Sequence, residues 1–501
     1  MSVSLLDTRV PAVLVRTDRN PFHHGTLGAV RSLGRAGVDV HLIADVTGSP
    51  VRRSRFVRRL HPPPPPGAGP ADIARTLLRV AAQVARPAVL IPLDDASAVA
   101  VARARDELAP AFLLPQQPGA LAERVADKAE LAAVCAAVGV PHPLTLIPDS
   151  ATEAAAAAWR LGLPTVAKWS RPWLLPAGSG LRSTVVVRSA RQARELYLRT
   201  EEAGSRLLLQ AFLPPGPDLD WFSHGYVDRT GTVRGGGPGR KLHSWPRAAG
   251  LTAVGHWTPN APVRALTERL IGELGYRGIF DLDYRRCTTT GGYHLLDFNP
   301  RPGAQFRLFT DTAGLDVVRA QHLDLTHRPM PEGAARPGRA FVVENYAPLS
   351  ALRPAPAGRE LAWHAPDDLG PGWAMWALWA RHAGRRLPSR LRRLCERSVP
   401  DDARSRVRVR VVRQGTDARP SETGGLPADV PVADRASDDG ARSDGALNDG
   451  AMSGGPLINA PRDGGPPTDT PRAGGPVTDV PVTGGPLTDG PLTDDEKASS
   501  C

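Results

Sequence analysis

The pattern of hydrophobic and polar positions at the start of the chain predicts strands that alternate with helices. Short apolar runs have the length of buried strands, and segments with apolar residues three or four positions apart lie between them. A strand, a helix and a second strand in this order predict a parallel sheet covered by helices. We therefore expect an open α/β domain over residues 1–118. The strands are expected at 11–15, 38–45 and 88–93, and the clearest helices at 71–85 and 95–108.

A polar loop follows the first expected strand. It contains His23, His24, Gly25 and Thr26, and it lies beyond the carboxyl end of that strand, where such sheets bind ligands. The loop lacks the pattern G-x-G-x-x-G, so no dinucleotide site is predicted. It either caps the helix that follows or contacts a substrate or its phosphate.

The next part of the chain combines one strand lysine with a flexible loop. Lys168 lies in the expected strand 163–170, and the loop 176–184 that follows contains Ser179 and Gly180. A strand lysine beside a loop rich in free backbone N–H groups suits nucleotide phosphates, although such a loop alone is more often an ordinary turn. Helices are expected around Asp127-Lys128 and at 151–161 and 189–203, and a further strand is expected at 206–221.

Two pairs of oxygen-bearing side chains stand out downstream. Asp281 and Asp283 are two positions apart in one expected strand, and Asp297 and Asn299 are two positions apart in the next. Side chains two apart on a strand point to the same face of the sheet. A hairpin of these strands would bring the four side chains together. Oxygen ligands suit Mg²⁺, which keeps further positions for water and phosphate.

The same acids could instead be solvated positions on half-exposed strands. Leu295, Leu296 and Phe298 surround them, however, and an unpaired acid near a hydrophobic core is unfavourable. We therefore favour the metal site. Arg301 follows directly, and its guanidinium group can hold a phosphate or a carboxylate through two hydrogen bonds.

The run Asp-Phe-Asn-Pro-Arg at 297–301, after an apolar strand, resembles the ATP-grasp family of carboxylate–amine or thiol ligases. D-alanine–D-alanine ligase, D-aspartate ligase and biotin carboxylase belong to that family. The resemblance extends over residues 10–330, and an α/β domain precedes the ATP-grasp domain in such enzymes. It implies an ATP-grasp domain over 119–335, with a central lobe near 140–210 and a C-terminal lobe near 211–335.

The resemblance also implies a metal site and a phosphate site. Asp297 and Asn299 would bind Mg²⁺, or Mn²⁺ as an alternative, together with Asp281 or Asp283. The family usually has glutamate where this chain has Asp297, and the shorter aspartate still binds magnesium. Arg301 and Lys241 would contact the reacting phosphate as the catalytic pair, with Arg240 as the second choice after Lys241.

Contacts to ATP are implied at several positions. Lys128 and Lys168 match the two lysines that touch ATP in such enzymes. The family's hinge glutamate is replaced by Ala211, so adenine would be held mainly by backbone groups. The remaining contacts are expected from Ser179 and Gly180 in the loop, from Gln210, Ala211 and Phe212 at the adenine, and from Asp218 or Asp220 at the ribose.

The reaction that the resemblance implies consumes Mg-ATP to give ADP and phosphate. ATP would phosphorylate the carboxylate of a small molecule, and the amine of a second small molecule would attack the acyl phosphate. Candidate proton acceptors are His224, His243 and His256, and no spacing singles one out. The alternatives are an ATP-grasp phosphotransferase acting on a non-carboxylate acceptor and a non-enzymatic protein that binds nucleic acid or membrane through a basic surface.

The charge of the chain raises the question of polyanionic partners. There are 62 Lys and Arg against 51 Asp and Glu, a formal net charge of +11. The arginines are spread and no nucleic-acid module is visible, so no nucleic acid is expected as a partner. A basic, tryptophan-bearing helix at 372–397, within an extension over 336–414, is either a packed terminal helix or a peripheral contact with an anionic membrane.

Residues 415–501 differ in composition from the rest. They contain no Phe, Trp, Tyr or His, and Gly-Gly-Pro recurs there every ten residues, at 454, 464, 474 and 484. A segment with so little to bury cannot offset the entropy of ordering, so a disordered tail rich in Gly, Pro and Asp is predicted.

The cysteines indicate the compartment. The chain has 4 Cys, which are scattered and form no Cys-x-x-Cys pair. That usage suits a reducing environment. No signal peptide and no membrane-spanning apolar run are recognised, so a cytoplasmic protein is expected.

Overall fold

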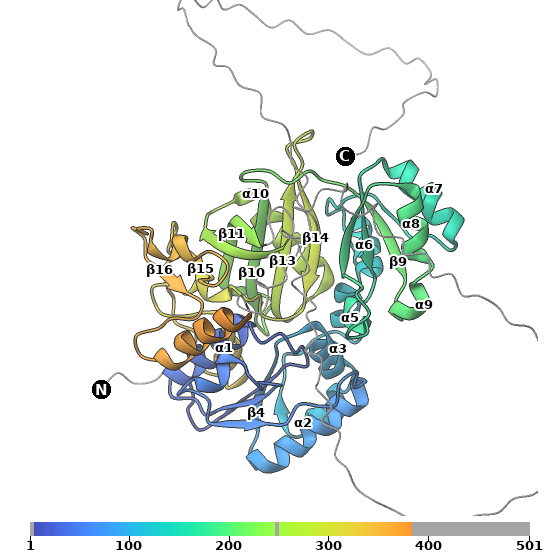
Figure 1. Ribbon diagram of the computed structural model, residues 1–501. Helices are drawn as coiled ribbons and strands as arrows, with labels where there is room; N and C mark the ends of the chain where they lie inside the picture. The colour runs from blue at the N-terminus through green and yellow to red at the C-terminus, as the bar shows by residue number, and fades with distance from the viewer. Residues whose placement is uncertain (1–4, 246–249, 383–501) are drawn as a thin grey trace, which may run out of the picture.

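The computed structural model describes residues 5–245 and 250–382, and this part is a mixed α/β structure with three β-sheets (Figure 1). The sheets have five, four and seven strands. The five-stranded sheet and its helices, drawn in blue, form the lower part of the molecule in Figure 1. The tail predicted at 415–501 lies outside the described residues, as does the predicted extension beyond residue 382.

The first sheet is parallel, as the sequence predicts. Its strands lie in the order β3-β2-β1-β4-β5, so β1 lies between β2 and β4. The helix predicted at 95–108 is divided, because α3 and α4 meet at Ala104. The strands are β1 (Ala12–Val15), β2 (Val40–Ile43), β3 (Arg59–His61), β4 (Ala88–Pro92) and β5 (Phe112–Leu113), and the helices are α1 (His24–Arg35), η1 (Pro50–Arg53), α2 (Pro70–Val84), α3 (Asp95–Arg103) and α4 (Arg105–Leu108).

The second sheet is a small antiparallel one in the order β6-β9-β7-β8. Its strand β7 carries Lys168, as expected. The helix predicted at 189–203 is divided into α8 and α9. The elements of this part are α5 (Leu121–Ala126), α6 (Lys128–Ala137), β6 (Thr145–Leu146), α7 (Ala151–Leu161), β7 (Thr165–Trp169), η2 (Pro172–Leu174), β8 (Thr184–Val187), α8 (Ala190–Tyr197), α9 (Thr200–Ala203) and β9 (Leu207–Ala211).

The third sheet has the order β14-β13-β10-β11-β12-β15-β16 and is antiparallel apart from the β15–β16 pair. The edge strand β14 and its neighbour β13 form the hairpin that the sequence predicts. The elements are β10 (Asp220–Val227), β11 (Val233–Trp245), β12 (Leu251–Trp257), α10 (Ala261–Leu274), β13 (Gly278–Arg286), β14 (Tyr293–Asn299), η3 (Phe306–Phe309), α11 (Val317–Leu325), β15 (Ala340–Val342), η4 (Pro348–Leu352) and β16 (Arg359–Leu361).

The single strand predicted at 206–221 is wrong. The segment forms two strands in different sheets, since β9 ends at Ala211 and β10 begins at Asp220. Pro214, Pro215 and Pro217 lie between them, and proline has no N–H to donate to a strand ladder. The prolines therefore mark the point where the chain leaves the second sheet and enters the third.

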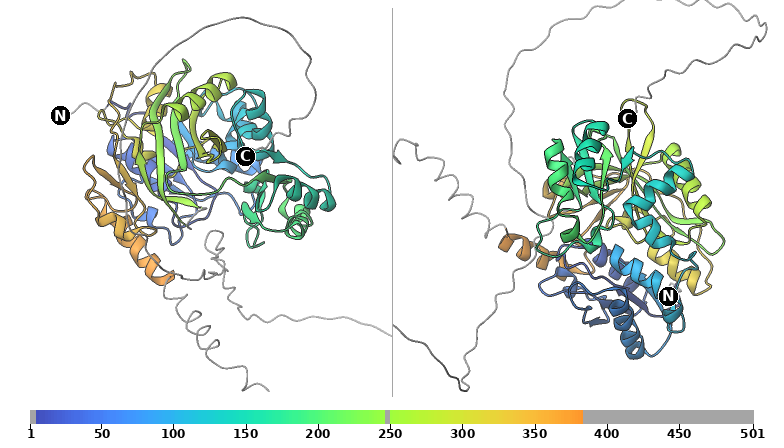
Figure 2. Two further views of the ribbon diagram at one scale, coloured as in Figure 1. Left: turned by 90° about the horizontal axis from the view of Figure 1, so that it is seen from above. Right: turned by 90° about the vertical axis from the view of Figure 1, so that its right-hand side faces the viewer.

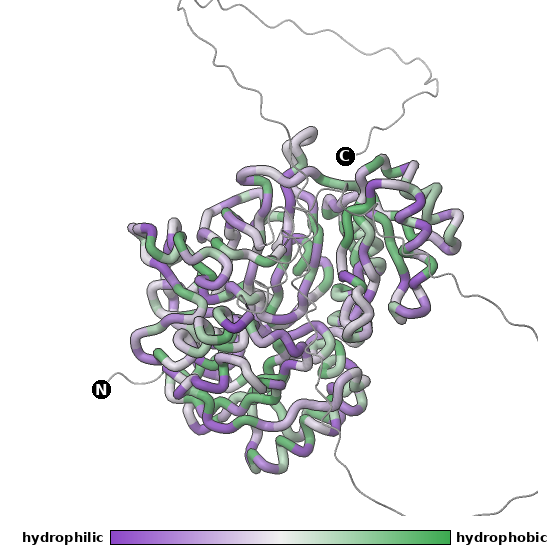
Figure 3. The backbone as a smooth tube through the Cα atoms, in the orientation of Figure 1, coloured by the Kyte–Doolittle hydropathy of each residue, from purple (hydrophilic) through white to green (hydrophobic). Residues whose placement is uncertain are grey.

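One hydrophobic core joins the first sheet to the seven-stranded sheet. Leu14 on β1 and Leu27 on α1 belong to the same buried cluster as Phe222 on β10 and Phe309 on η3. All four side chains are fully buried. Hydrophobic stretches, in green in Figure 3, alternate with hydrophilic ones along the chain in both parts. Because interiors are closely packed, the shared core fixes how the two sheets face each other.

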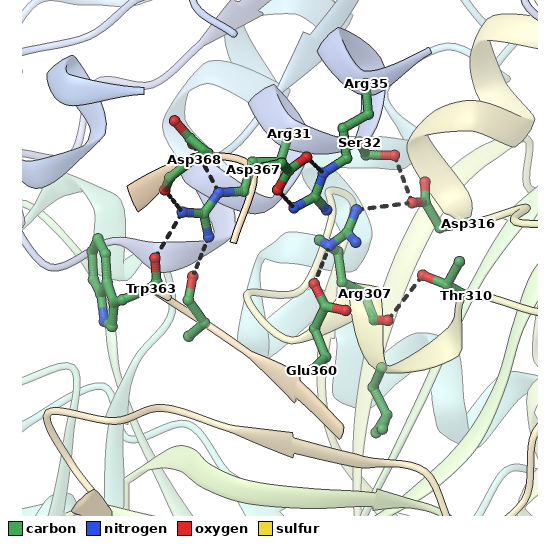
Figure 4. A network of polar contacts seen from close by, with 12 residues as sticks. Arg31, Ser32, Arg35, Arg307, Thr310, Asp316, Glu360, Trp363, Asp367 and Asp368 are labelled. Atoms are coloured by element: carbon green, nitrogen blue, oxygen red, sulfur yellow. Dashed lines mark hydrogen bonds and ion pairs between the residues drawn. The ribbon is translucent and has the colours of Figure 1, made fainter. Parts of the chain in front are cut away.

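A buried polar network ties α1 to the C-terminal part of the described chain (Figure 4). Nε of Arg31 donates to Asp368 at 2.9 Å, and its Nη2 donates to the carbonyl of Trp363 at 2.7 Å. Next to it, Ser32 donates to Asp316 at 2.6 Å. Since Arg31 and Asp368 are only 3% and 2% exposed, α1 is held firmly in one orientation.

The last described element is a helix over 369–382 at the periphery of the molecule (Figure 2). Met375 is buried on its inner side, whereas Trp373, Trp376 and Trp379 are 71%, 37% and 39% exposed. These tryptophans are three positions apart and therefore share one face of the helix. Within the described chain, every helix is too short or too polar to cross a membrane.

Candidate active site

Four oxygen-bearing side chains meet on one face of the β13–β14 hairpin. Asp281 lies opposite Asn299, and Asp283 lies opposite Asp297. Residues directly opposite each other in an antiparallel pair point to the same face, and so do residues two apart on one strand. The structure thus brings together all four residues that the sequence selects as metal ligands.

Lys128 reaches this face from the first position of α6. Asp127 caps the helix, because its Oδ1 accepts the N–H of Ala129 at 3.0 Å, while its Oδ2 accepts Nε of Arg171 at 2.8 Å. The Nζ of Lys128 donates to Oδ1 of Asp297. The lysine side chain is 10% exposed, so this charge-assisted bond is largely shielded from water. The capped helix end therefore presents the ammonium group to β14.

Lys168 reaches the same strand from the second sheet. Its Nζ donates to the carbonyl of Leu296 at 2.8 Å, next to Asp297. Burial lowers the pKa of Lys168 to about 8, although the negative charge of Asp297 acts in the opposite direction. A buried lysine with one carbonyl partner gains from a nearby anion, because its charge is otherwise poorly solvated.

Lys241 approaches the hairpin from β11. Its Nζ lies 3.7 Å from Oδ1 of Asp283. The neighbouring Arg240 points elsewhere and pairs with Asp218 at 2.9 Å. Of the two candidates in this segment, Lys241 is therefore the one at the hairpin, and Arg240 is not brought to it.

Arg301 connects the hairpin with the first sheet. Its Nε lies 2.9 Å from Asp95 at the start of α3, and its Nη1 lies 3.5 Å from Asp281. Its Nη2 donates to Oδ1 of Asn299 at 3.2 Å. Although burial opposes the charged form, Asp95, Asp281 and Asp297 raise the pKa of Arg301. Asp95 was missed in the sequence, because an acid in the first turn of a helix is common and shows no sign of a distant partner.

The carboxyl groups of the hairpin are electrostatically distinct. Burial disfavours ionisation of Asp297, but Lys128 and Lys168 outweigh it and lower its pKa. The pKa of Asp283 is instead raised, because burial and the charges of Asp281 and Asp297 exceed the effect of Lys241. The two facing carboxyl groups, Asp283 and Asp297, therefore differ in the direction of their pKa shifts.

His224 on β10 lies directly opposite Asp281 on β13. Its Nε2 is 2.9 Å from Oδ1 of Asp281, and its side chain is fully buried. Burial raises the pKa of Asp281, but the neighbouring His224 ring outweighs it and contributes to lowering the pKa of that carboxyl. A Cβ on Gly303 would lie 2.3 Å from the imidazole Cε1, so glycine is required there. The sequence analysis selects His224 as a candidate, but its contact with Asp281 could not be predicted because it depends on the register of β10 and β13.

The Gly/Ser loop lies at the end of the β7–β8 hairpin. Lys168 is paired with Thr184, the first residue of β8, and the loop directly precedes it. The carbonyl of Ser179 accepts Nη2 of Arg199 at 2.8 Å, and Gly180 has a φ of +70°. Among the described residues, neither makes a hydrogen bond to the β13–β14 hairpin. The loop is therefore near the strand lysine but is not held against the acids.

The predicted adenine segment is the end of β9. The side-chain amide of Gln210 donates to the hydroxyl of Thr145 at 3.0 Å. The backbone carbonyl of Gln210 accepts a hydrogen bond from the hydroxyl of Thr165 at 2.7 Å. The N–H of Ala211 donates to the carbonyl of Leu144 at 2.8 Å. The sheet thus already uses these groups of Gln210 and Ala211, and the strand ends before Phe212.

The two candidate ribose contacts are engaged in ion pairs. Asp218 pairs with Arg240, and Asp220 lies 2.6 Å from Nε of Arg285. Arg285 also donates to the carbonyl of Leu213 at 2.9 Å, so it links Asp220 to the residue that follows the predicted adenine segment. Of these two acids, Asp220 is the one that the structure connects with the predicted nucleotide contacts.

The carboxylates of the β13–β14 hairpin could bind a metal ion only together with further ligands such as water and phosphate. Among the described residues, no group of three or more His, Cys, Asp or Glu side chains is arranged to hold one. Asp283 and Asp297 lie opposite each other, and burial together with the neighbouring carboxylates raises the pKa of Asp283. A hard cation such as Mg²⁺, which keeps water and phosphate among its ligands, fits such a pair.

The chain resembles known proteins in its fold. No protein-family profile matches it, and no curated protein matches its sequence. A biotin carboxylase–β,γ-ATP complex from Campylobacter jejuni is 12% identical, with 66% of this chain and 74% of that chain covered and a TM-score of 0.50. The biotin carboxylase domain of a 2-oxoglutarate carboxylase from Hydrogenobacter thermophilus is 17% identical over 66% of this chain and 73% of that one, with a TM-score of 0.49. An L-amino acid ligase from Bacillus licheniformis is 14% identical over 66% and 79%, with a TM-score of 0.48.

These identities carry no information on the reaction. The likeness to the Campylobacter enzyme shows the fold alone, and the fold is the one that the run at 297–301 implies. The chain therefore has the ATP-grasp fold.

Proposed function

We propose that this protein is an ATP-dependent ligase that activates a carboxylate as an acyl phosphate for attack by an amine. The observation that carries the proposal is the gathering of Lys128, Lys168, Lys241 and Arg301 around the acids of the β13–β14 hairpin. The four cations come from four separate segments of an ATP-grasp fold. Such a set suits the transfer of a highly charged phosphoryl group.

The residues divide into nucleotide, metal and reaction roles. Lys128 and Lys168 bind ATP phosphates, the loop with Ser179 and Gly180 covers them, and adenine is held by the backbone after Ala211. Asp297 and Asn299, with Asp283 or Asp281, hold Mg²⁺, which neutralises phosphate charge when bound; Mn²⁺ is the alternative. Arg301 and Lys241 are the catalytic pair, and the ribose contacts Asp220 or Asp218.

The reaction proceeds by two displacements. An oxygen of the substrate carboxylate attacks the γ-phosphorus of ATP, the bond from that phosphorus to the bridging oxygen breaks, and ADP leaves. The nitrogen of the amine then attacks the acyl carbon, phosphate leaves, and the amine proton passes to water or to the departing phosphate. Arg301 and Lys241 stabilise the charge on the transferred group, so no covalent bond to a side chain is required.

The likeness in fold to a biotin carboxylase supports this class of substrate. A small carboxylate and a small amine are the substrates that we propose for this chain. A stable phosphorylated product formed without an amine would favour a phosphotransferase instead.

The test is ADP release from Mg-ATP by the full chain, with pooled carboxylates and pooled amino acids added separately and together. Turnover that needs both pools and is lost in Asp297→Asn supports the ligase. The matched control is Asp106→Asn, an exposed acid on α4. Magnesium-dependent ATP binding without turnover in any mixture would place the substrates outside the pools, and the absence of ATP binding would overturn the proposal.

We further propose that the segment 372–397 contacts an anionic membrane surface. Its described part exposes Trp373, Trp376 and Trp379 on one helix face. Residues 381–397 contain seven arginines and one acid, which complements a negatively charged surface.

A further inference from the structure

Arg16, directly after β1, is a buried cation with unused hydrogen-bond donors. Its side chain is fully buried, and its Nη1 donates to the carbonyl of Asn20 at 2.8 Å. Its Nε and Nη2 have no hydrogen-bond partner among the described residues. A buried charge without a partner is strongly unfavourable. The guanidinium group therefore lacks an acceptor that would satisfy both free nitrogens.

The acids near Arg16 do not meet this need. Asp94 is used by the loop after β1, since it accepts the N–H groups of Thr17 at 2.5 Å and Asp18 at 2.7 Å and also that of Ser97 at 2.8 Å. No acid in the described chain forms an ion pair with Arg16. Burial outweighs the attraction of the nearby acids and lowers the pKa of Arg16. The loop is thus fixed by Asp94, while the arginine remains uncompensated.

The guanidinium group lies at the N-terminus of α1. The carbonyl of Asn20 accepts both Nη1 of Arg16 and the N–H of His23, at 2.8 Å and 3.3 Å. His23 caps α1, a helix of 12 residues with no acid in its first turn. The positive end of the helix dipole and the free arginine nitrogens therefore act at the same place.

This place adjoins the proposed reaction centre. A Cβ on Gly25, in the first turn of α1, would lie 2.9 Å from Cα of Ala304, so the helix end packs against the segment just after Arg301. Burial and the charges of Arg16 and Arg301 lower the pKa of His23, the residue that caps α1.

We propose that Arg16 and the N-terminal turn of α1 bind an oxyanion group of a substrate, a carboxylate or a phosphate, in addition to the carboxylate that reacts. As a statement about the substrate, this rests on the proposed ligase function. It specifies a substrate with two anionic groups, one at Arg16 and one at Arg301. Binding of the oxyanion itself does not depend on turnover.

The experiment is thermal unfolding of the full chain with sodium phosphate or sodium malonate at constant ionic strength, with and without saturating MgADP. Each anion series is measured for the wild type, Arg16→Met and Lys168→Met. We expect an anion-dependent rise in Tm for the wild type and Lys168→Met, and its loss in Arg16→Met. A response to phosphate alone identifies a phosphate group, and a response to malonate alone identifies a carboxylate.

Arg16→Met also separates a binding role from a structural one. Because it removes an uncompensated buried charge, it is expected to melt at or above the wild-type temperature without added anion. Arg16→Lys, which keeps a charge but loses the planar donors, is expected to raise the apparent Kd for the anion about tenfold. An unchanged anion response in either variant, or no response in the wild type, would overturn the proposal. If MgADP fails to stabilise the wild type, the ligase function fails while the result for Arg16 stands.

Discussion

The guanidinium group of Arg301 lies 2.9 Å from the carboxylate of Asp95, although the two residues are 206 positions apart in the chain. Asp95 begins α3 beside the first sheet, and Arg301 directly follows the hairpin of the third sheet. The same guanidinium contacts Asp281 and Asn299. This single side chain therefore couples the position of the first sheet to that of the proposed metal ligands.

Asp95→Asn is expected to lower kcat about tenfold or more while leaving the Kd for ATP within a factor of two, because it weakens a charge-assisted bond that orients Arg301. Steady-state ADP release and equilibrium binding of ATP measure the two quantities. Asp106→Asn is the control, and it should match the wild type in both. An unchanged kcat would show that Arg301 is oriented without Asp95.

The choice between Asp283 and Asp281 as the first metal ligand can be decided by magnesium dependence. Asp281 is already in contact with His224 and Arg301, whereas Asp283 faces Asp297 and has Lys241 only at 3.7 Å. We expect Asp283→Asn to raise the Mg²⁺ concentration for half-maximal ADP release at least about tenfold, as loss of one anionic ligand does.

Asp281→Asn should lower kcat with a smaller effect on that Mg²⁺ concentration. EDTA should abolish ADP release by the wild type, and excess Mg²⁺ should restore it. The reverse order of the two variants would assign the metal to Asp281.

Affinity for ATP is expected to depend on the charge of Lys168. Its pKa is lowered to about 8 by burial, so the ammonium form is lost as the pH rises through that value. The Kd for MgATP should therefore rise up to about tenfold between pH 7 and 9, following the fall in the protonated fraction. Lys168→Arg keeps its charge over this range and should give a flat profile. An equally steep profile in that variant would place the titrating group elsewhere.

The stability of the link between α1 and the C-terminal segment is expected to depend on one buried ion pair. Arg31→Met leaves Asp368 buried without its partner, and we expect a loss of about 3–5 kcal/mol in the free energy of unfolding. The matched control is Arg75→Met, whose partner Asp72 is exposed, and it should cost less than about 1 kcal/mol. Urea denaturation followed by tryptophan fluorescence measures both. Equal values for the two variants would contradict the structural role of the Arg31–Asp368 pair.

Local patterns in the sequence predicted much of the site. The hairpin follows from the two-residue alternation of Asp281 with Asp283 and of Asp297 with Asn299, because this period decides which face a side chain takes. The end of one strand and the start of the next were harder to predict in the segment 206–221. Three prolines lie between these two strands, and because proline lacks an N–H for strand pairing, they were the signal in the sequence that a strand ends there.

Contacts between distant segments could not be predicted. Lys128 meets Asp297 across 169 positions, and Asp95 meets Arg301 across 206. Neither contact leaves a local pattern, since each depends on how complete sheets pack against each other. The unpartnered nitrogens of Arg16 could not be predicted from the sequence either, because the burial of a side chain depends on the whole fold.

Binding to membranes is expected from the tryptophan face of the helix over 369–382 and the arginines that follow it. Trp373, Trp376 and Trp379 are exposed on one face, and tryptophan is favoured at the membrane–water interface. Each arginine near an anionic surface adds about 1 kcal/mol. Full-length protein should therefore sediment with vesicles of phosphatidylcholine and phosphatidylserine in a ratio of about 7:3, and much less with phosphatidylcholine alone.

The variant Trp373→Ala/Trp376→Ala/Trp379→Ala should lose most of this binding and keep its ATP affinity, because the three side chains are exposed and the helix that carries them lies at the periphery of the fold (Figure 2). Trp159→Ala is the matched control, since Trp159 on α7 is a single tryptophan that is 70% exposed. High salt should weaken the wild-type interaction by screening the arginines. Equal sedimentation of wild type and triple variant would show that the exposed tryptophans serve another contact.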